Sequence, residues 1–333
     1  MTFPHLNGRA EKLAQELDLA PDMAEWIAVV ALHSGCFLRT QYLDFRSQLR
    51  YAGERLVKLL VKKHLVVEMP KNRLGLLCRV TNKNVYRVLG EADSRHRRLA
   101  HWPYMSRRLL SLDYVLDHPG LPWLPTESEK VSCFNKLEIY GVDLPFRIYR
   151  GAGAGGYTKR YFANKHPIAV DTSAKRAVFV YADSDESGTK GLRSWRDEHA
   201  ALFSNLHRKG FHLSVVHATR NPKLSSSVRR LFKVWEKTPV NAEKHSKEAR
   251  ELRRLNHALA GDDAAELTRL GGFNTALRRA AALERRLKDK SEPAGYEASY
   301  GVWVSKRIPE KDDKHNRLGP HHRKAQAAGD DDS

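Results

Sequence analysis

The chain has 333 residues, a formal net charge of +19 and an isoelectric point near 9.9, and 41% of its residues are hydrophobic. This length allows two domains with real cores, and the charge favours polyanions such as nucleic acid. We expect no membrane segment, because no apolar run reaches about eighteen residues and the first residues lack a signal-peptide core. Three scattered cysteines fit no zinc-site spacing and indicate a reducing, cytoplasmic setting. Within the cytoplasm, the affinity for nucleic acid expected from the positive charge predicts association with the nucleoid.

The first part of the sequence predicts a winged helix-turn-helix, which we place in a domain covering residues 20–117. Its predicted helices, in chain order, are 22–34, 40–46, 48–64, 82–89 and 95–116. Two predicted strands, 65–69 and 76–81, flank the turn PKNRLG, which would form the wing. Ser47 is the expected N-cap of helix 48–64, which carries apolar residues on one face and Arg or Lys on the other.

Double-stranded DNA is the partner that this domain predicts. A recognition helix reaches base edges with its N-terminal part, and neighbouring cations meet phosphates. Between residues 50 and 110 there are 15 Lys and Arg against 4 acids, a local excess of +11. The expected DNA-binding residues are Gln48, Arg50, Tyr51, Arg55, Lys58, Lys62, Lys71, Asn72, Arg73, Arg107 and Arg108. The alternative is a winged helix that contacts proteins, with these charges simply solvated.

The Pro-rich segment HPGLPWLP, residues 118–125, predicts a connector before a second domain at 126–222. The strands expected there are 136–140, 146–149, 161–162, 168–171, 177–183 and 213–218. A helix over 192–209 lies between the last two, and strand–helix–strand order predicts a parallel pair and an α/β fold. The glycine-rich segment 151–157 lacks the Lys-Ser/Thr of a P-loop and is expected to be a hairpin turn.

Four carboxylates follow two of these strands: Asp171, Asp183, Asp185 and Glu186. Nucleases of the PD-(D/E)xK type bind Mg²⁺ between acids on adjacent strands, and a Lys two residues further on helps to stabilise charge on the cleaved phosphate. That Lys is absent here. The four acids are therefore catalytic candidates only for a metal-dependent nuclease, and no cofactor other than its Mg²⁺ is expected. The competing interpretation is a solvated turn that caps the next helix.

A winged helix followed by a connector and a degenerate nuclease-like core resembles the plasmid replication-relaxation and mobilisation proteins of bacterial mobile elements. In that family an Arg-Pro-Asp and a Glu-x-Asp-x-Gly-Thr mark the second domain. Pro167 matches the first motif, Ile168 replaces its acid and leaves Asp171 as a displaced substitute, and 186–189 match the end of the second motif, with Ser184 where the Glu is expected. The resemblance covers roughly residues 20 to 220.

This resemblance implies a sequence-specific DNA-binding protein of a mobile element, either a transcriptional regulator or a replication or mobilisation accessory factor. The alternative is a metal-dependent DNA nickase or relaxase-like nuclease that uses the central domain. Residues 223–308 are expected to be mainly helical with one late strand at 296–304, and 309–333 to be disordered. A homodimer through these helices or through the α/β domain is the expected self-association, and a protein-interaction scaffold is a third class of function.

Overall fold

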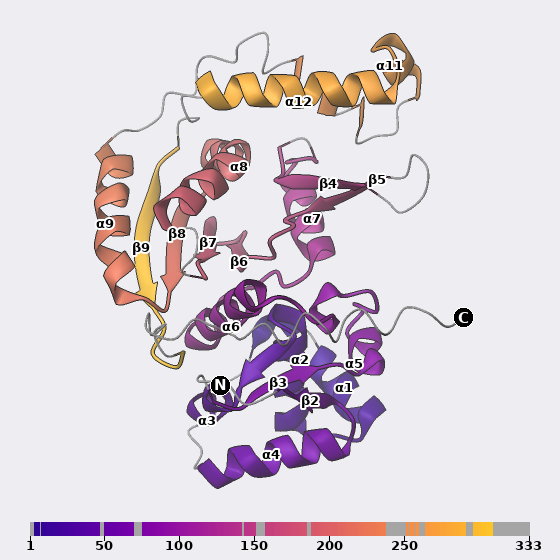
Figure 1. Cartoon of the computed structure of the whole chain (residues 1–333), viewed down its shortest axis with the longest axis vertical. Helices are drawn as coiled ribbons and strands as arrows, with labels where there is room; N and C mark the ends of the chain where they lie inside the picture. Colours follow the sequence, from indigo (N-terminus) through magenta and orange to yellow (C-terminus); the bar gives the residue numbers. More distant parts are fainter. Residues whose placement is uncertain are drawn as a thin grey trace, which may run out of the picture.

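The described part of the chain combines α-helices with three small β-sheets, in agreement with the mixed fold class expected from the sequence (Figure 1). The computed structural model describes residues 3–6, 8–46, 50–69, 75–141, 143–150, 157–184, 188–237, 251–252, 254–256, 258–259, 264–290 and 296–308. No helix within these residues combines the length and apolar character that a bilayer crossing requires.

The N-terminal unit is a helical cluster with one three-stranded sheet. Its helices are α1 (Arg9–Leu17), α2 (Pro21–His33), α3 (Arg39–Phe45), α4 (Arg50–Lys62) and α5 (Lys83–Val88), preceded by a 3-10 turn at Pro4–Leu6. Its strands are β1 (Cys36–Leu38), β2 (Val66–Glu68) and β3 (Leu77–Val80). They pair antiparallel in the order β1-β3-β2. The helices and strands expected between residues 22 and 89 are therefore all present, with ends shifted by a few residues.

A single long helix joins this unit to the rest of the molecule. The basic segment expected as one helix over 95–116 is instead a short 3-10 turn, Arg95–Arg97, followed by α6 (Trp102–Asp117), which Pro103 begins in its first turn. Residues 109 to 116 of α6 are all buried. The helix packs against α2 and β1 on one side and against the central sheet on the other (Figure 1).

The central sheet has the strand order β6 (Ile168–Asp171), β7 (Arg176–Ala182), β8 (His212–Thr219) and β9 (Ala298–Val304). β6 and β7 form an antiparallel hairpin, whereas β7, β8 and β9 run parallel. Helix α8 (Gly188–Arg208) connects β7 to β8, which confirms the expected parallel strand–helix–strand unit. A separate antiparallel pair is formed by β4 (Phe146–Arg150) and β5 (Tyr157–Tyr161).

The strand expected at residues 136–140 is wrong. Helix α7 (Glu127–Lys136) occupies the preceding segment and continues into a turn. Thr126 caps this helix, since its Oγ1 accepts a hydrogen bond from the Glu129 backbone N–H at 3.1 Å while Glu129 bonds back to the Thr126 backbone. The capping box, and not the short apolar run after it, decides the local structure.

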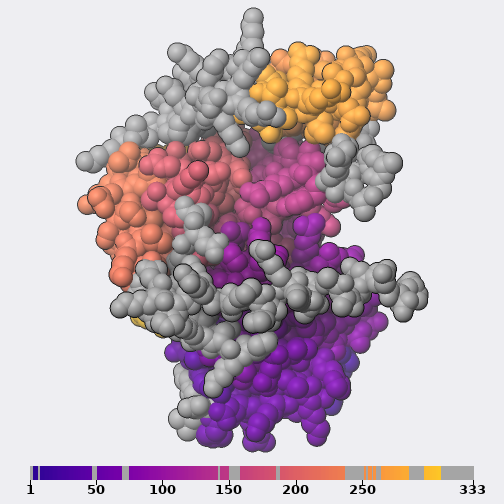
Figure 2. All heavy atoms as spheres, viewed as in Figure 1, coloured from indigo at the N-terminus to yellow at the C-terminus, as the bar shows by residue number. Residues whose placement is uncertain are grey.

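The two faces of the central sheet contribute to different hydrophobic cores, because successive residues of a strand point to opposite sides. Val180 and Ala182 of β7, with Ala218 of β8, join the core that includes α6 and the N-terminal unit. Phe179 of β7 and Val215 of β8 join a second core with α8 and with α9 (Pro222–Lys237). Figure 2 shows the N-terminal unit in indigo and purple below the central segments in magenta and orange.

The expected boundary at residue 222 does not separate these cores. Helix α9 packs on β8 and β9, and β9 completes the central sheet after a chain excursion of more than 60 residues. Between them, α11 (Ala264–Arg269) and α12 (Phe273–Lys290) form a small third core with residues near 255, at the end of the molecule away from α4 (Figure 1). The expected disordered tail, 309–333, lies outside the described residues.

Candidate nucleic-acid interface

Helix α4 is fixed to the N-terminal unit by one apolar face. Leu56, Val57 and Leu60 are at most 6% exposed and belong to the first core. Gly53 lies where α4 approaches α3: a Cβ at this position would come within 2.8 Å of Leu43 Cδ2 and 2.9 Å of Arg39 Cγ. A glycine in a helix costs about 1 kcal/mol of stability relative to alanine. The close packing of α3 against α4 explains why a residue without a side chain stands at this position.

The opposite face of α4 is exposed and cationic. Tyr51 is 67% exposed, and Arg55, Lys58 and Lys62 are exposed as well. Their spacing of four, three and four residues places all four side chains along one side of the helix. None of the three cations forms an ion pair with a described residue. Figure 1 shows α4 at the outer edge of the molecule, on the side away from α6 and the central sheet.

Several expected DNA-binding residues lie outside the described part of the chain. These are Gln48, Lys71, Asn72 and Arg73, together with the expected N-cap Ser47. Arg50 begins α4, but its side chain is likewise outside what the structure describes. The described strands β2 and β3 nevertheless pair antiparallel on either side of residues 70–74, so the segment expected to form a wing connects two adjacent strands.

The assignment of Arg108 to DNA is contradicted by its surroundings. Its guanidinium donates to the carbonyl oxygens of Arg95, His96 and Arg98 at 3.1, 3.4 and 3.5 Å. Burial lowers the pKa of Arg108. The side chain therefore holds the 3-10 turn against α6, and its hydrogen-bonding capacity is directed into the protein. Arg107, its neighbour, is partly buried and stacks over the Tyr104 ring at 5.4 Å.

Two of the catalytic candidates, Asp171 and Asp183, lie at opposite ends of the central hairpin. Asp171 pairs with Arg176 at the first residue of β7, whereas Asp183 follows the last. Seven residues of strand at about 3.3 Å each separate these ends by roughly 23 Å. A single metal ion cannot bridge that distance, since Mg²⁺–oxygen bonds are about 2.1 Å long. Asp171 is therefore not the displaced metal ligand that the sequence suggested.

Asp171 instead caps the turn between β6 and β7. Its Oδ1 accepts hydrogen bonds from the backbone N–H groups of Ser173 and Ala174 at 3.0 and 2.9 Å, and from the Ser173 hydroxyl at 2.6 Å. The bonds from Ala174 and Ser173 lower the pKa of this carboxyl. This is the Asx-turn role that aspartate often has in tight turns.

Asp183 is buried at the end of β7, where its Oδ2 lies 3.2 Å from Nε2 of His217 on β8. Both side chains are fully shielded from solvent. His212, at the other end of β8, is exposed. Asp185 and Glu186 lie outside the described residues, and among the residues that are described no three His, Cys, Asp or Glu side chains converge as metal ligands.

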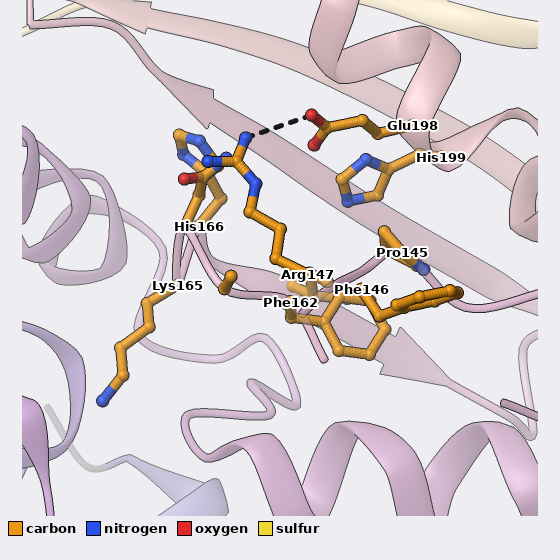
Figure 3. A pocket seen from close by; sticks show the side chains of 11 residues that line it. Pro145, Phe146, Arg147, Phe162, Lys165, His166, Glu198 and His199 are labelled. Atoms are coloured by element: carbon orange, nitrogen blue, oxygen red, sulfur yellow. Dashed lines mark hydrogen bonds and ion pairs between the residues drawn. The ribbon is translucent and has the colours of Figure 1, made fainter. Parts of the chain in front are cut away.

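A small pocket beside β6 is closed by an ion pair. Arg147 of β4 donates to Glu198 of α8 at 3.0 Å, across the rings of His166 and His199 (Figure 3). His166 Nδ1 accepts the Ala182 backbone N–H at 3.1 Å, and burial lowers the pKa of His166 well below its ordinary value. The free volume of about 20 Å³ suits a single water molecule and no larger ligand.

The sequence reasoning missed the buried polar residues around β6, above all His166 and Lys130. Lys130 lies on α7 and is only 2% exposed. A single lysine in a helix that also carries Glu and Asn gives no signal of burial, since the partner surface comes from distant segments.

Comparison with protein-family models, with curated proteins and with solved structures gave no match for this chain. Function is therefore inferred from exposure, charge and geometry alone.

Proposed function

We propose that the protein binds double-stranded DNA through the exposed face of α4, with sequence selectivity. The observation that carries this proposal is the row formed by Tyr51, Arg55, Lys58 and Lys62, which is exposed and without ion-pair partners among the described residues. A row of this kind on a helix at the edge of the molecule is the electrostatic footprint of a DNA-binding helix.

The chain order around α4 supports the same proposal. A strand, two helices and an antiparallel hairpin follow one another, and the first strand pairs with the last in the sheet order β1-β3-β2. We propose that this is a winged helix-turn-helix with α4 as its recognition helix and the β2–β3 connection as its wing. In such a domain the recognition helix enters the major groove.

Different positions on α4 then have different roles. Tyr51 and Arg55, in the first two turns, are placed to reach base edges, and an arginine can bond two acceptors of a guanine. Lys58 and Lys62, further along, are placed to meet phosphates, which fix the register of the helix without reading sequence.

For the wider role, we propose a regulator or an accessory factor of replication or mobilisation in a mobile genetic element, as the resemblance to the replication-relaxation proteins implies. The nuclease alternative is weaker, because Asp171 and Asp183 stand at opposite ends of β7. A DNA-handling role that requires binding without cleavage is consistent with this separation.

The test compares two triple variants of the full chain that remove the same charge. One is Arg55→Ala, Lys58→Ala, Lys62→Ala on α4, and the other is Arg229→Ala, Arg230→Ala, Lys233→Ala on the exposed side of α9. Binding to a duplex recovered by selection from random sequences is measured by fluorescence anisotropy over a range of salt concentrations. We expect the α4 variant to lose at least about 100-fold in affinity and to lower the salt slope by about one per lost phosphate contact.

The α9 variant should keep the selected sequence and nearly all of its affinity. Both variants should unfold in urea within about 0.5 kcal/mol of the wild type, because exposed side chains contribute little to stability. Equal losses in the two variants would mean that binding reflects net charge only, and an unchanged affinity in the α4 variant would refute the assignment of α4.

A further inference from the structure

A cleft of about 520 Å³ opens between the N-terminal unit and the segments that flank α7. One wall is the turn after α5, residues 90–95, and the other is formed by the first turns of α7 and by residues 160–165. Ligand sites for small molecules usually have volumes of about 300 to 1,000 Å³ and often lie between structural units. The cleft is lined by residues after α5 and around α7, whereas helix α4 lies at the outer edge of the N-terminal unit (Figure 1).

Lys130 lines this cleft, and among the described residues it uses only part of its hydrogen-bonding capacity. It is 2% exposed, and its Nζ donates one hydrogen bond, to the His166 carbonyl oxygen at 2.9 Å. An ammonium group has three donors, and no carboxylate of a described residue lies within ion-pair distance of this one. Burial lowers the pKa of Lys130 to about 7, with the neighbouring Lys165 charge contributing in the same direction.

Lys165 is the second cation of the cleft. Figure 3 shows its side chain directed away from the small pocket beside β6. Its Nζ has no hydrogen-bond or ion-pair partner among the described residues, and burial lowers the pKa of Lys165 to about 8. Two ammonium groups that face the same cleft repel each other, and both gain if an anion is bound between them.

The other charged groups of the cleft leave room for such an anion. Glu127 is already occupied: it accepts the Tyr161 backbone N–H at 2.8 Å and pairs with Arg160 at 3.7 Å. Burial raises the pKa of the Glu91 carboxyl, whose charge attracts Lys165 although the two side chains form no ion pair. Phe162 is only 6% exposed and packs into the second core, and the Lys130 Nζ lies 5.7 Å from its ring centroid. The remaining charged residues at the rim are Asp93 and Arg95.

We infer that this cleft binds a small phosphate-bearing ligand, most simply a nucleoside phosphate, between the N-terminal unit and α7. Phosphate oxygens accept the free donors of Lys130 and Lys165, and Glu91 accepts N–H or O–H donors of the base or ribose. A ligand in this position contacts both sides of the cleft, so its binding stabilises the arrangement of the two units. This inference does not depend on DNA binding by α4.

The experiment measures binding of ATP, GTP and inorganic pyrophosphate to the full-length protein by isothermal titration calorimetry. The variants are Lys165→Met and Lys130→Met, which keep the length and apolar stem of the side chain. The matched control is Lys136→Met, since Lys136 is exposed at the end of the same helix as Lys130. The α4 triple variant is titrated as well, because a polyanion could also bind to the exposed cations there.

We expect saturable binding of at least one nucleotide, weakened at least 10-fold by Lys165→Met and by Lys130→Met. Binding should be unchanged in Lys136→Met and in the α4 triple variant, and pyrophosphate should bind more weakly than the nucleotide. Absence of binding for all three probes at millimolar concentration would overturn the inference, as would equal affinity in the wild type and Lys165→Met. Loss of nucleotide binding only in the α4 variant would place the anion on that helix and not in the cleft.

Discussion

Helices α4 and α6 both carry basic side chains, yet the charges of the two helices have different roles. On α4, Arg55, Lys58 and Lys62 are exposed and have no ion-pair partners among the described residues. On α6, Arg108 bonds three backbone carbonyls and the buried Asp113 accepts hydrogen bonds from three side chains. A charged side chain is available to bind a partner only where the fold has not already satisfied its charge. Substitutions in α6 should therefore change the stability of the protein, and substitutions on the exposed face of α4 should change DNA binding.

The largest effect is expected at Asp113, which is fully buried. It accepts hydrogen bonds from Gln41 at 3.2 Å, Ser305 at 2.5 Å and Arg307 at 3.2 Å, and so connects α3, α6 and the segment after β9. Breaking a buried charge network by removing one partner costs about 3–5 kcal/mol. Asp113→Ala should lower the free energy of unfolding in urea by this amount.

The control for that measurement is Glu11→Ala on the exposed surface of α1, which should change stability by less than about 0.5 kcal/mol. If Asp113→Ala is as stable as Glu11→Ala, the network does not hold α6 in place. The expected role of the buried charges of α6 in stability would then be refuted.

A pH change should produce the next largest effect, because His199 is buried in the second core. Burial lowers its pKa from 6.5 to about 4, although its Nδ1 donates to the Trp195 carbonyl at 2.8 Å. The unfolded chain takes up a proton near pH 6.5 and the folded chain only near pH 4. Stability is therefore fully present above pH 6.5 and falls as the pH decreases to 4, by about 3 kcal/mol for this group.

Other groups titrate in the same window, so the measurement compares the wild type with His199→Phe. The phenylalanine keeps an aromatic ring next to Trp195 and Phe203, whose rings lie 4.6 and 5.7 Å from that of His199. Urea unfolding between pH 7 and 4 should show a weaker decline in the variant by about 3 kcal/mol. Parallel pH profiles for the two proteins would show that His199 is not held neutral by the fold.

The smallest effect is expected for Arg108→Ala, which removes hydrogen bonds from a charged donor to the 3-10 turn. Such bonds contribute about 1.5–3 kcal/mol, so we expect a loss of about 2 kcal/mol in unfolding free energy. DNA affinity and its salt slope should stay at the wild-type values, measured at a temperature where the variant is folded. A salt slope reduced as in the α4 triple variant would show that Arg108 meets phosphate after all.

Local patterns in the sequence were sufficient for most helices and strands. The continuous apolar runs in 168–171 and 177–183 predicted β6 and β7, and the apolar face of 48–64 predicted α4. The wrong predictions concern segments whose structure depends on contacts with distant residues or on a local signal that was overlooked. The capping box formed by Thr126 and Glu129 is visible in the sequence, but the expected strand at 136–140 did not take it into account.

Some features of the candidate site could likewise be predicted from the sequence, and others could not. The exposed row on α4 could be predicted from helical spacing alone, since Tyr51, Arg55, Lys58 and Lys62 recur at turns of one helix. The short connection between the strands expected at 168–171 and 177–183 already implies antiparallel pairing, because parallel strands need a crossover of about a dozen residues or more, so the separation of Asp171 and Asp183 was also predictable. The sequence could not show Lys130 and Lys165 at one cleft, since 34 residues separate them.

By itself, the sequence determined the amphipathic character of α4, the βαβ order of the central region and the basic character of residues 50 to 110. Those properties follow from the period of apolar side chains and from charge, which are local quantities. Only the tertiary structure decided which basic residues are free. It directs Arg108 into the protein, leaves the cations of α4 exposed, and brings Lys130 and Lys165 together, because burial and hydrogen bonding are set by segments far apart in the chain.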